Sequence, residues 1–152
     1  MAEDNGLGHE TELSAQRSFW RTHLAERLAS LQPAPHITGD EELHELARMT
    51  VGLAIGFLLD ADKTELEDET PRANPYALAE LAQLRDIVRA SVMRLPLREQ
   101  QLIRGHYFEH REFREIARDM TVTPGRVSQL HSQALERIRN LLKQTSGFDR
   151  NL

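Results

Sequence analysis

The stretch from residue 113 to residue 138, FREIARDMTVTPGRVSQLHSQALERI, decides the fold. Its apolar residues recur three and four positions apart, as in helices, rather than alternating as in strands. Thr123 and Pro124 divide the stretch, because a threonine hydroxyl caps a free helix N–H and proline suits the first position of a helix. Ala117 is small enough to let a short first helix cross the second one closely. The stretch therefore predicts a helix-turn-helix.

The two helices of this motif carry enough apolar residues for a small core of their own. Thr121 stands at the turn, where similar motifs often have glycine. A β-branched residue disfavours a positive φ angle, so we expect a strained or differently shaped turn. The expected core residues are Ile116, Met120, Val122, Val127 and Leu130.

The second helix has a polar face at its N-terminal end. When its apolar residues face inward, helical geometry turns the intervening polar side chains to solvent. Glutamine can bond adenine with two hydrogen bonds, arginine can bond guanine or phosphate, and short serines let a helix sit deep in the major groove. The alternative is an ordinary helical hairpin with a polar face. The expected base-reading residues are Arg126, Ser128, Gln129, Ser132 and Gln133.

The charge of the chain is distributed unevenly. The net charge is -5, but residues 1–85 contain seven Lys and Arg against 16 Asp and Glu, whereas residues 86–143 contain 11 against seven. A locally basic segment can neutralise phosphates within an acidic chain, because salt screens charges beyond about 10 Å. We expect phosphate contacts from Arg114, Arg118, Arg137, Arg139 and Lys143.

Helical spacing continues through most of the chain, which predicts an all-α protein with a helical N-terminal module and a C-terminal helix-turn-helix bundle. The expected helices cover residues 12–31, 40–59 with Asp40 as a capping residue, 75–94, and 96–108 with Pro96 in the first turn. The domain boundaries that we expect are a disordered tail at 1–11, a helical module at 12–59, an acidic linker at 60–75, the helix-turn-helix domain at 76–143 and a tail at 144–152.

Composition argues against several other classes of protein. Cysteine is absent, which removes disulfides, thiolate metal sites and cysteine nucleophiles. The longest apolar run, residues 49–59, is too short to span a bilayer, and the acidic N-terminus does not resemble a signal peptide. His106 and His110 have the spacing of a chelating pair, but we expect no metal and no cofactor. We expect a cytoplasmic protein that is not an enzyme.

Four segments of the C-terminal half resemble bacterial sigma-70 family factors, most closely those of the flagellar or motility type. They are LPLREQQLI from residue 95, HYFE from 106, EIA from 115 and RVSQLHSQALERIR from 126. The resemblance covers the C-terminal domain usually called region 4, and the helix at 76–94 looks like its lead-in. It implies a transcription initiation factor.

The resemblance also implies partners. It places Arg126, Ser128, Gln129 and Gln133 at or beside positions that read the promoter -35 element, and implies that the helix at 96–108 docks on the flap of the RNA polymerase β subunit. The family often has charged residues where this chain has Pro124 and Gly125, so we expect a distinctive -35 preference. The expected docking residues are Arg98, Gln101, Leu102 and Arg104.

Three alternatives remain at this stage. No segment matches the aromatic-rich region that melts the -10 element, so we expect the C-terminal portion of a sigma factor, with residues 12–59 in the place of the family's middle region. The chain could instead be a stand-alone helix-turn-helix regulator, which predicts a dimer on a palindromic site. It could also be one half of a split sigma factor that joins a second sigma subunit, or the target of an anti-sigma protein. The acidic stretch at 60–69 is either a solvated linker or a mimic of nucleic acid.

Overall fold

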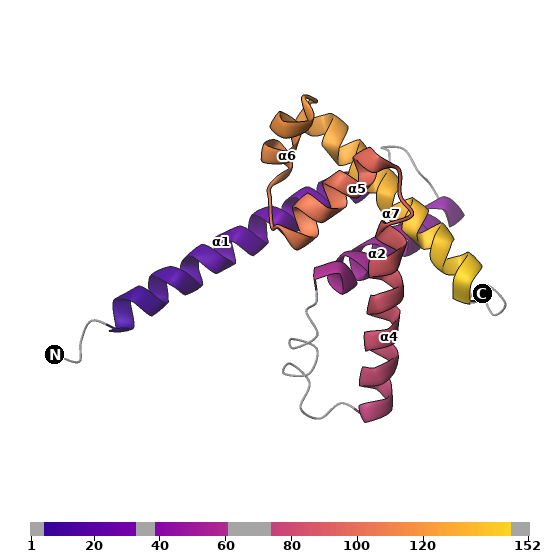
Figure 1. Ribbon diagram of the computed structural model, residues 1–152, viewed down its shortest axis with the longest axis horizontal. Helices are drawn as coiled ribbons and strands as arrows, with labels where there is room; N and C mark the ends of the chain where they lie inside the picture. Colours follow the sequence, from indigo (N-terminus) through magenta and orange to yellow (C-terminus); the bar gives the residue numbers. More distant parts are fainter. Residues whose placement is uncertain (1–4, 33–38, 61–73, 147–152) are drawn as a thin grey trace.

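The computed structural model describes residues 5–32, 39–60 and 74–146 (Figure 1). These ranges contain helices and no strand, so the predicted all-α class is confirmed for the part of the chain that is described. The elements are α1 (Asn5–Leu31), α2 (Asp40–Asp60), α4 (Pro75–Val92), α5 (Leu97–Ile103), the π-helix η1 (Arg104–Phe108), α6 (Phe113–Met120) and α7 (Pro124–Ser146).

The long helix α7 is the central element of the fold. Helices α1, α2, α4, α5 and α6 all pack against it. Figure 1 shows the C-terminal part of α1 crossing the body of the molecule, while the N-terminal part extends away from the other helices. The helix-turn-helix α6–α7 is thus joined on one side by helices that come from the N-terminal half of the chain.

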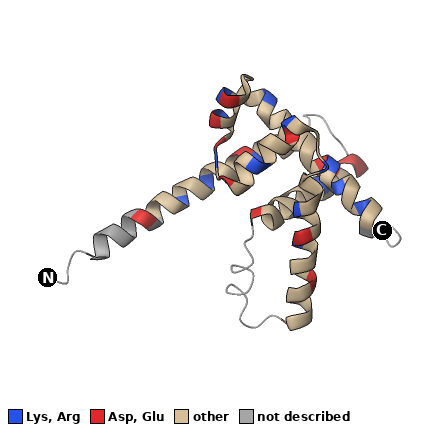
Figure 2. Ribbon diagram, in the orientation of Figure 1, with Lys and Arg blue, Asp and Glu red and all other residues tan. Residues whose placement is uncertain are grey.

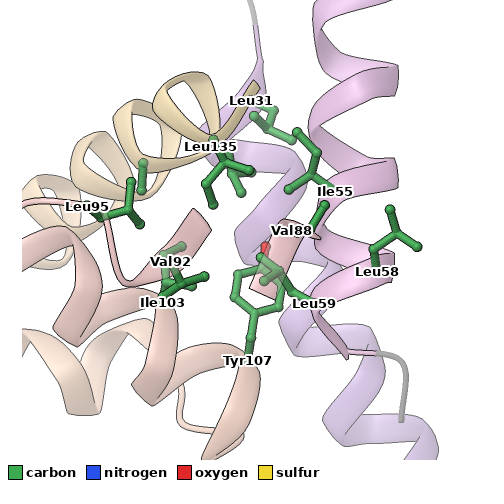
Figure 3. Packing of buried hydrophobic residues seen from close by; sticks show 12 residues of the cluster. Leu31, Ile55, Leu58, Leu59, Val88, Val92, Leu95, Ile103, Tyr107 and Leu135 are labelled. Atoms are coloured by element: carbon green, nitrogen blue, oxygen red, sulfur yellow. The ribbon is translucent and has the colours of Figure 1, made fainter. Parts of the chain in front are cut away.

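One hydrophobic core joins the two halves that the sequence divides at the acidic linker (Figure 3). Leu31 and Leu59 come from the N-terminal helices, Val88 and Tyr107 from the middle of the chain, and Ile138 from α7, and each is at most 2% exposed. The N-terminal helices and the C-terminal half therefore share one buried core. The apolar end of α2 needs a partner, and the nearest apolar faces belong to α4, η1 and α7.

The ends of three helices differ in how well the sequence locates them. Helix α4 begins at the predicted position, since the Asn74 side chain accepts a hydrogen bond from the Tyr76 N–H at 3.1 Å and proline follows it. Helix α1 begins at Asn5, so residues 5–11 of the predicted tail are helical. Glycine weakens a helix but does not break it as proline does. Helix α7 also continues beyond residue 143, to Ser146.

The predicted helix at 96–108 has two parts. Pro96 has a ψ angle of 148° and is the N-cap, so the helix begins one residue later than predicted. The α-helical turns end at Ile103, and the wider π-helix η1 continues to Phe108. Within η1, Gly105 lies against α6, where an added Cβ would lie 3.4 Å from Ile116 Cδ1.

The start of α2 differs from the predicted one. Asp40 is the first residue of α2 rather than its cap, and Gly39, with φ of 72°, provides the turn before it. Asp60 ends α2. Most of the predicted linker, residues 61–73, lies outside the described residues, as do 1–4 and 147–152.

Candidate nucleic-acid interface

The turn between α6 and α7 forms as a left-handed cap. Thr121 has φ of 56° and ψ of 47°, and its N–H bonds to the Arg118 carbonyl at 3.2 Å. The next N–H, of Val122, bonds to the Ala117 carbonyl at 3.0 Å. This geometry satisfies carbonyls at the end of α6, but it places a β-branched residue in a conformation that glycine adopts more easily. Thr121 therefore has the positive φ angle that a β-branched residue disfavours.

The start of α7 forms as the sequence predicts. Pro124 occupies the first position, and the Arg126 N–H donates to the Thr123 hydroxyl at 3.2 Å. The hydroxyl therefore satisfies one of the N–H groups that a helix leaves free at its start. The reading end of α7 is fixed by its own sequence.

A small core holds the two helices of the motif together. Ile116, Val127 and Leu130 are buried in it, and Met120 and Val122 pack against it, as predicted. The structure adds one buried side chain from α5 and two from α6. These additional members are Leu102, Phe113 and Ala117.

The predicted base-reading residues divide into two groups. Arg126, Gln129 and Gln133 are exposed, and the guanidinium of Arg126 donates to the Gln129 side-chain oxygen at 3.2 Å. Ser128 and Ser132 are half-buried. The side of α7 that carries the two serines is thus less accessible than the side that carries the two glutamines.

Ser132 lies beside the N-terminal helices. It lines a small cavity together with Leu31 of α1, residues of α2, and residues of the following turns of α7. The full lining is Leu31, Arg48, Gly52, Ile55, Ser132, Leu135, Glu136 and Arg139.

The predicted phosphate contacts have different surroundings. Arg114 and Arg118 are exposed on α6, and Lys143 is exposed near the end of α7. Arg137 is also accessible, although its Nε donates to the buried carboxylate of Glu99 at 3.0 Å. Arg139 is half-buried on the side of α2. Figure 2 shows basic residues along α7 and a mixture of both charges on α6.

The predicted polymerase-docking residues also differ in their exposure. Arg98, Gln101 and Arg104 are exposed, whereas Leu102 is fully buried in the small core of the motif and is corrected to a core residue. Its position on the inner face of α5 explains the difference. A groove of about 480 Å³ lies between the segment that joins α4 to α5 and the last turns of α7. It is lined by Arg94, Leu95, Pro96, Arg137, Asn140, Leu141 and Gln144.

A buried polar network connects α7 to α1, α2 and η1, and sequence reasoning missed it. Arg27 donates from Nε to His106 Nε2 at 2.9 Å and pairs with the carboxylate of Asp60 through both terminal nitrogens. Its guanidinium lies 4.2 Å from the centre of the Tyr107 ring. We use the name buried polar network for Arg27, Ser30, Asp60, His106, Tyr107 and His131.

The hydrogen bonds of the network define the tautomer of each histidine. The Ser30 hydroxyl donates to the Arg27 carbonyl, so its oxygen accepts from His131 Nδ1 at 2.6 Å. The other ring nitrogen, Nε2, then accepts from the Tyr107 hydroxyl at 2.7 Å. His106 accepts from Arg27 at Nε2 and donates from Nδ1 to the Arg111 carbonyl at 2.8 Å.

Burial keeps these histidines uncharged. Desolvation lowers the pKa of His106 to about 2 and that of His131 to about 3, and the nearby Arg27 guanidinium lowers both further. Burial likewise raises the pKa of Tyr107. His110, the other half of the predicted chelating pair, is exposed, and the described residues contain no group of three or more side chains suited to a metal ion.

Helix α1 also contacts the first helix of the motif. The Phe113 N–H, at the start of α6, donates to Glu26 Oε1 at 3.1 Å. A carboxylate at this position satisfies a free N–H and interacts favourably with the positive end of the helix dipole. Helix α1 therefore contacts both helices of the motif, α6 through Glu26 and α7 through Ser30.

These features define a helix-turn-helix domain of the type that binds DNA. Comparison with protein families assigns it more closely: residues 92–140 match the family model for Sigma-70, region 4. The chain is 38% identical over 82 residues to RNA polymerase sigma factor FliA of Escherichia coli K12, which covers 53% of this chain and 34% of that protein. The corresponding protein of Salmonella typhimurium gives the same values. That of Yersinia enterocolitica is 38% identical over 74 residues, covering 49% and 32%.

Residues 92–140 are therefore a region 4 domain of the sigma-70 family, and the resemblance predicted from the sequence is confirmed over this part of the chain. The chain spans about a third of the length of the curated relatives that it matches. No solved structure matches it. Among the described helices, none is long and apolar enough to cross a membrane.

Proposed function

We propose that this chain provides the promoter -35 reading and polymerase-docking functions of a sigma factor. The observation that carries the proposal is the capped N-terminal end of α7, which presents Arg126, Gln129 and Gln133 to solvent. These side chains suit hydrogen bonding to guanine and adenine edges in the major groove. Arg114 and Arg118 of α6, together with Lys143, would contact phosphates on either side.

The docking part of the proposal rests on the exposed surface that begins at α5. Arg98, Gln101 and Arg104 are exposed there, and a groove at the segment before α5 combines an apolar lining, Leu95 and Leu141, with basic and amide side chains. Such a lining suits an apolar helix with acidic flanks. We propose that the flap of the RNA polymerase β subunit binds to this surface.

The test is retention of core RNA polymerase by the tagged chain, followed by footprinting on promoter DNA. We expect protection of a -35 site that is lost in Arg126→Ala and Gln129→Ala, each loss amounting to about 1–3 kcal/mol of binding free energy. Gln83→Ala is a matched control, because Gln83 is exposed on α4, outside the proposed interface. A chain that retains no polymerase and protects no -35 site contradicts the proposal.

Two other results would identify the alternatives. Binding to a palindromic duplex as a dimer without polymerase identifies a stand-alone regulator. Retention of polymerase together with promoter binding that appears only after a second protein is added identifies one half of a split sigma factor.

A further inference from the structure

Glu99 of α5 is a carboxylate buried beneath an exposed arginine of the neighbouring helix α7. Its side chain is 4% exposed, and its Oε1 accepts a hydrogen bond from Arg137 Nε at 3.0 Å. Its other oxygen, Oε2, is buried and has no hydrogen-bond partner among the described residues. The charge of Glu99 is therefore balanced by Arg137, with which it forms an ion pair.

The arginine is open on its outer side. The Arg137 side chain is 56% exposed, and Glu99 is the one group that bonds to it in the part of the chain that the structure describes. The bond to Glu99 uses Nε, the nitrogen nearest the side-chain stem, so the two terminal nitrogens have no protein partner there. An arginine edge with parallel N–H groups matches the oxygens of a phosphate.

Arg137 lies on the same side of α7 as two of the exposed reading residues. Gln129, Gln133 and Arg137 are spaced four residues apart, and each is exposed. Four residues make slightly more than one helical turn and advance the helix by about 6 Å, so the three side chains form one line along α7. When the two glutamines face base edges, Arg137 lies one turn further on, where the helix leaves the groove and passes the phosphate backbone.

The carboxylates near Arg137 leave its outer edge free for a ligand. Glu136, the preceding residue, has its Oε1 3.8 Å from Arg139 Nη1. Glu99 contacts Arg137 from the inner side, where the guanidinium lies between the buried carboxylate and solvent. A buried acceptor in this position fixes the rotamer of an arginine without occupying the edge that a ligand would use.

We propose that Glu99 is a positioning residue for DNA binding, which holds Arg137 by Nε so that the two terminal nitrogens bind one phosphate of the DNA backbone. The inference rests on the proposed function, since it needs the reading end of α7 to lie in the major groove. Ordering a long side chain at an interface costs conformational entropy, and an arginine that is already held avoids part of this cost.

The test separates the position of Arg137 from the charge of Glu99 by comparing two neutral substitutions, Glu99→Gln and Glu99→Met. Both keep nearly the size of glutamate and remove its charge, but the amide oxygen of glutamine still accepts the hydrogen bond from Arg137 Nε. Fluorescence anisotropy measures binding to a labelled duplex library with a randomised centre, with and without core RNA polymerase. We expect Glu99→Gln to bind about threefold to tenfold more tightly than Glu99→Met.

The same comparison in an Arg137→Ala background is the control. There the two Glu99 variants should bind equally, because no guanidinium remains to be positioned. A role of Glu99 in packing alone would leave the same difference in both backgrounds, and that result overturns the inference.

Salt dependence gives an independent measurement. The slope of log affinity against log salt concentration should be steeper by about 0.9 for Glu99→Gln than for Glu99→Met, because one more phosphate is neutralised. Equal slopes overturn the inference. Retention of core polymerase is measured for each variant, because Arg137 also lines the groove beside the segment before α5. A difference in retention that accounts for the whole difference in affinity assigns Arg137 to docking and also overturns it.

A second variant keeps the inference testable if Glu99→Met does not fold. Arg137→Lys keeps the charge, but an ammonium held by Glu99 has no planar edge left for a phosphate. We expect a loss of about threefold to tenfold relative to the wild type, and an unchanged affinity overturns the inference.

The outcomes distinguish this inference from the proposed function. Equal binding by Glu99→Gln and Glu99→Met, with a -35 footprint that Gln129→Ala loses, overturns the role of Glu99 and leaves the proposed function intact. Absence of duplex binding by the wild type, even with core polymerase present, contradicts the proposed function and the inference that rests on it.

Discussion

The helix-turn-helix and the N-terminal helices are specified in different ways. Between α6 and α7, the turn and the start of α7 have local causes: Thr123 caps, Pro124 begins the helix and Thr121 adopts the left-handed conformation of the turn. In α1 and α2, the described contacts that position each helix connect residues far apart in the sequence, such as Arg27 with His106 and Leu31 with Gly52. A region with local signals can be located from a short stretch of sequence, whereas a region held by distant contacts depends on the packing of the whole chain.

The largest effect should come from removing the charge at the centre of the distant contacts. Arg27→Ala leaves Asp60 and His106 without their partner in a buried setting, and an uncompensated buried charge costs about 3–5 kcal/mol. Urea unfolding should show this loss. Arg48→Ala, which removes a half-exposed pair with Glu45, should cost less than about 1 kcal/mol. Equal losses in the two variants would mean that the buried polar network does not hold α1 in place.

Acid should destabilise the buried polar network, which contains His106 and His131. The folded-state pKa values of His106 and His131, about 2 and about 3, lie below the ordinary value of 6.5, so the unfolded chain takes up protons first. The stabilisation is complete above pH 6.5 and is lost as the pH falls toward 3, by about 1.4 kcal/mol per histidine per pH unit. The raised pKa of Glu26 acts in the opposite direction.

The pH effect can be measured as the free energy of unfolding in urea between pH 7.5 and pH 5.5, where we expect a loss of about 2–3 kcal/mol. His110→Gln serves as the control, because His110 is exposed and should leave the slope unchanged. A flat profile would show that the two buried rings are protonated as easily as in the unfolded chain.

The smallest effect should come from the local signals of the turn. Thr121→Gly removes a β-branched residue from the left-handed conformation and should stabilise the protein by about 1 kcal/mol. Thr123→Ala removes the cap of α7 and should destabilise it by about 1 kcal/mol. Thermal melting should record shifts of about 2–4 °C in opposite directions. Shifts of the same sign would contradict the local origin of the turn.

The sequence predicted the candidate site better than its surroundings. The start of α7, the small core of the motif and the exposure of Arg126, Gln129 and Gln133 follow from spacing and capping within a short stretch. The sequence predicts a docking role for Leu102 from its place in the helix at 96–108, but a helix position alone does not tell which neighbour covers it. His131 has the same difficulty. It stands four residues after the buried Val127 and is itself buried, but its hydrogen-bond partners lie in α1 and η1, far away in the sequence.

The sequence by itself determined the helix-turn-helix, because caps, turns and helical periodicity act between residues a few positions apart. Only the tertiary structure decided that α1 and α2 share a core with this domain and cover one side of α7. The physical reason is that burial of an apolar face is not directional and does not name its partner. Which faces meet depends on the whole chain, through close approaches such as that of Gly52 to Leu31 and through buried hydrogen bonds such as that of Ser30 with His131.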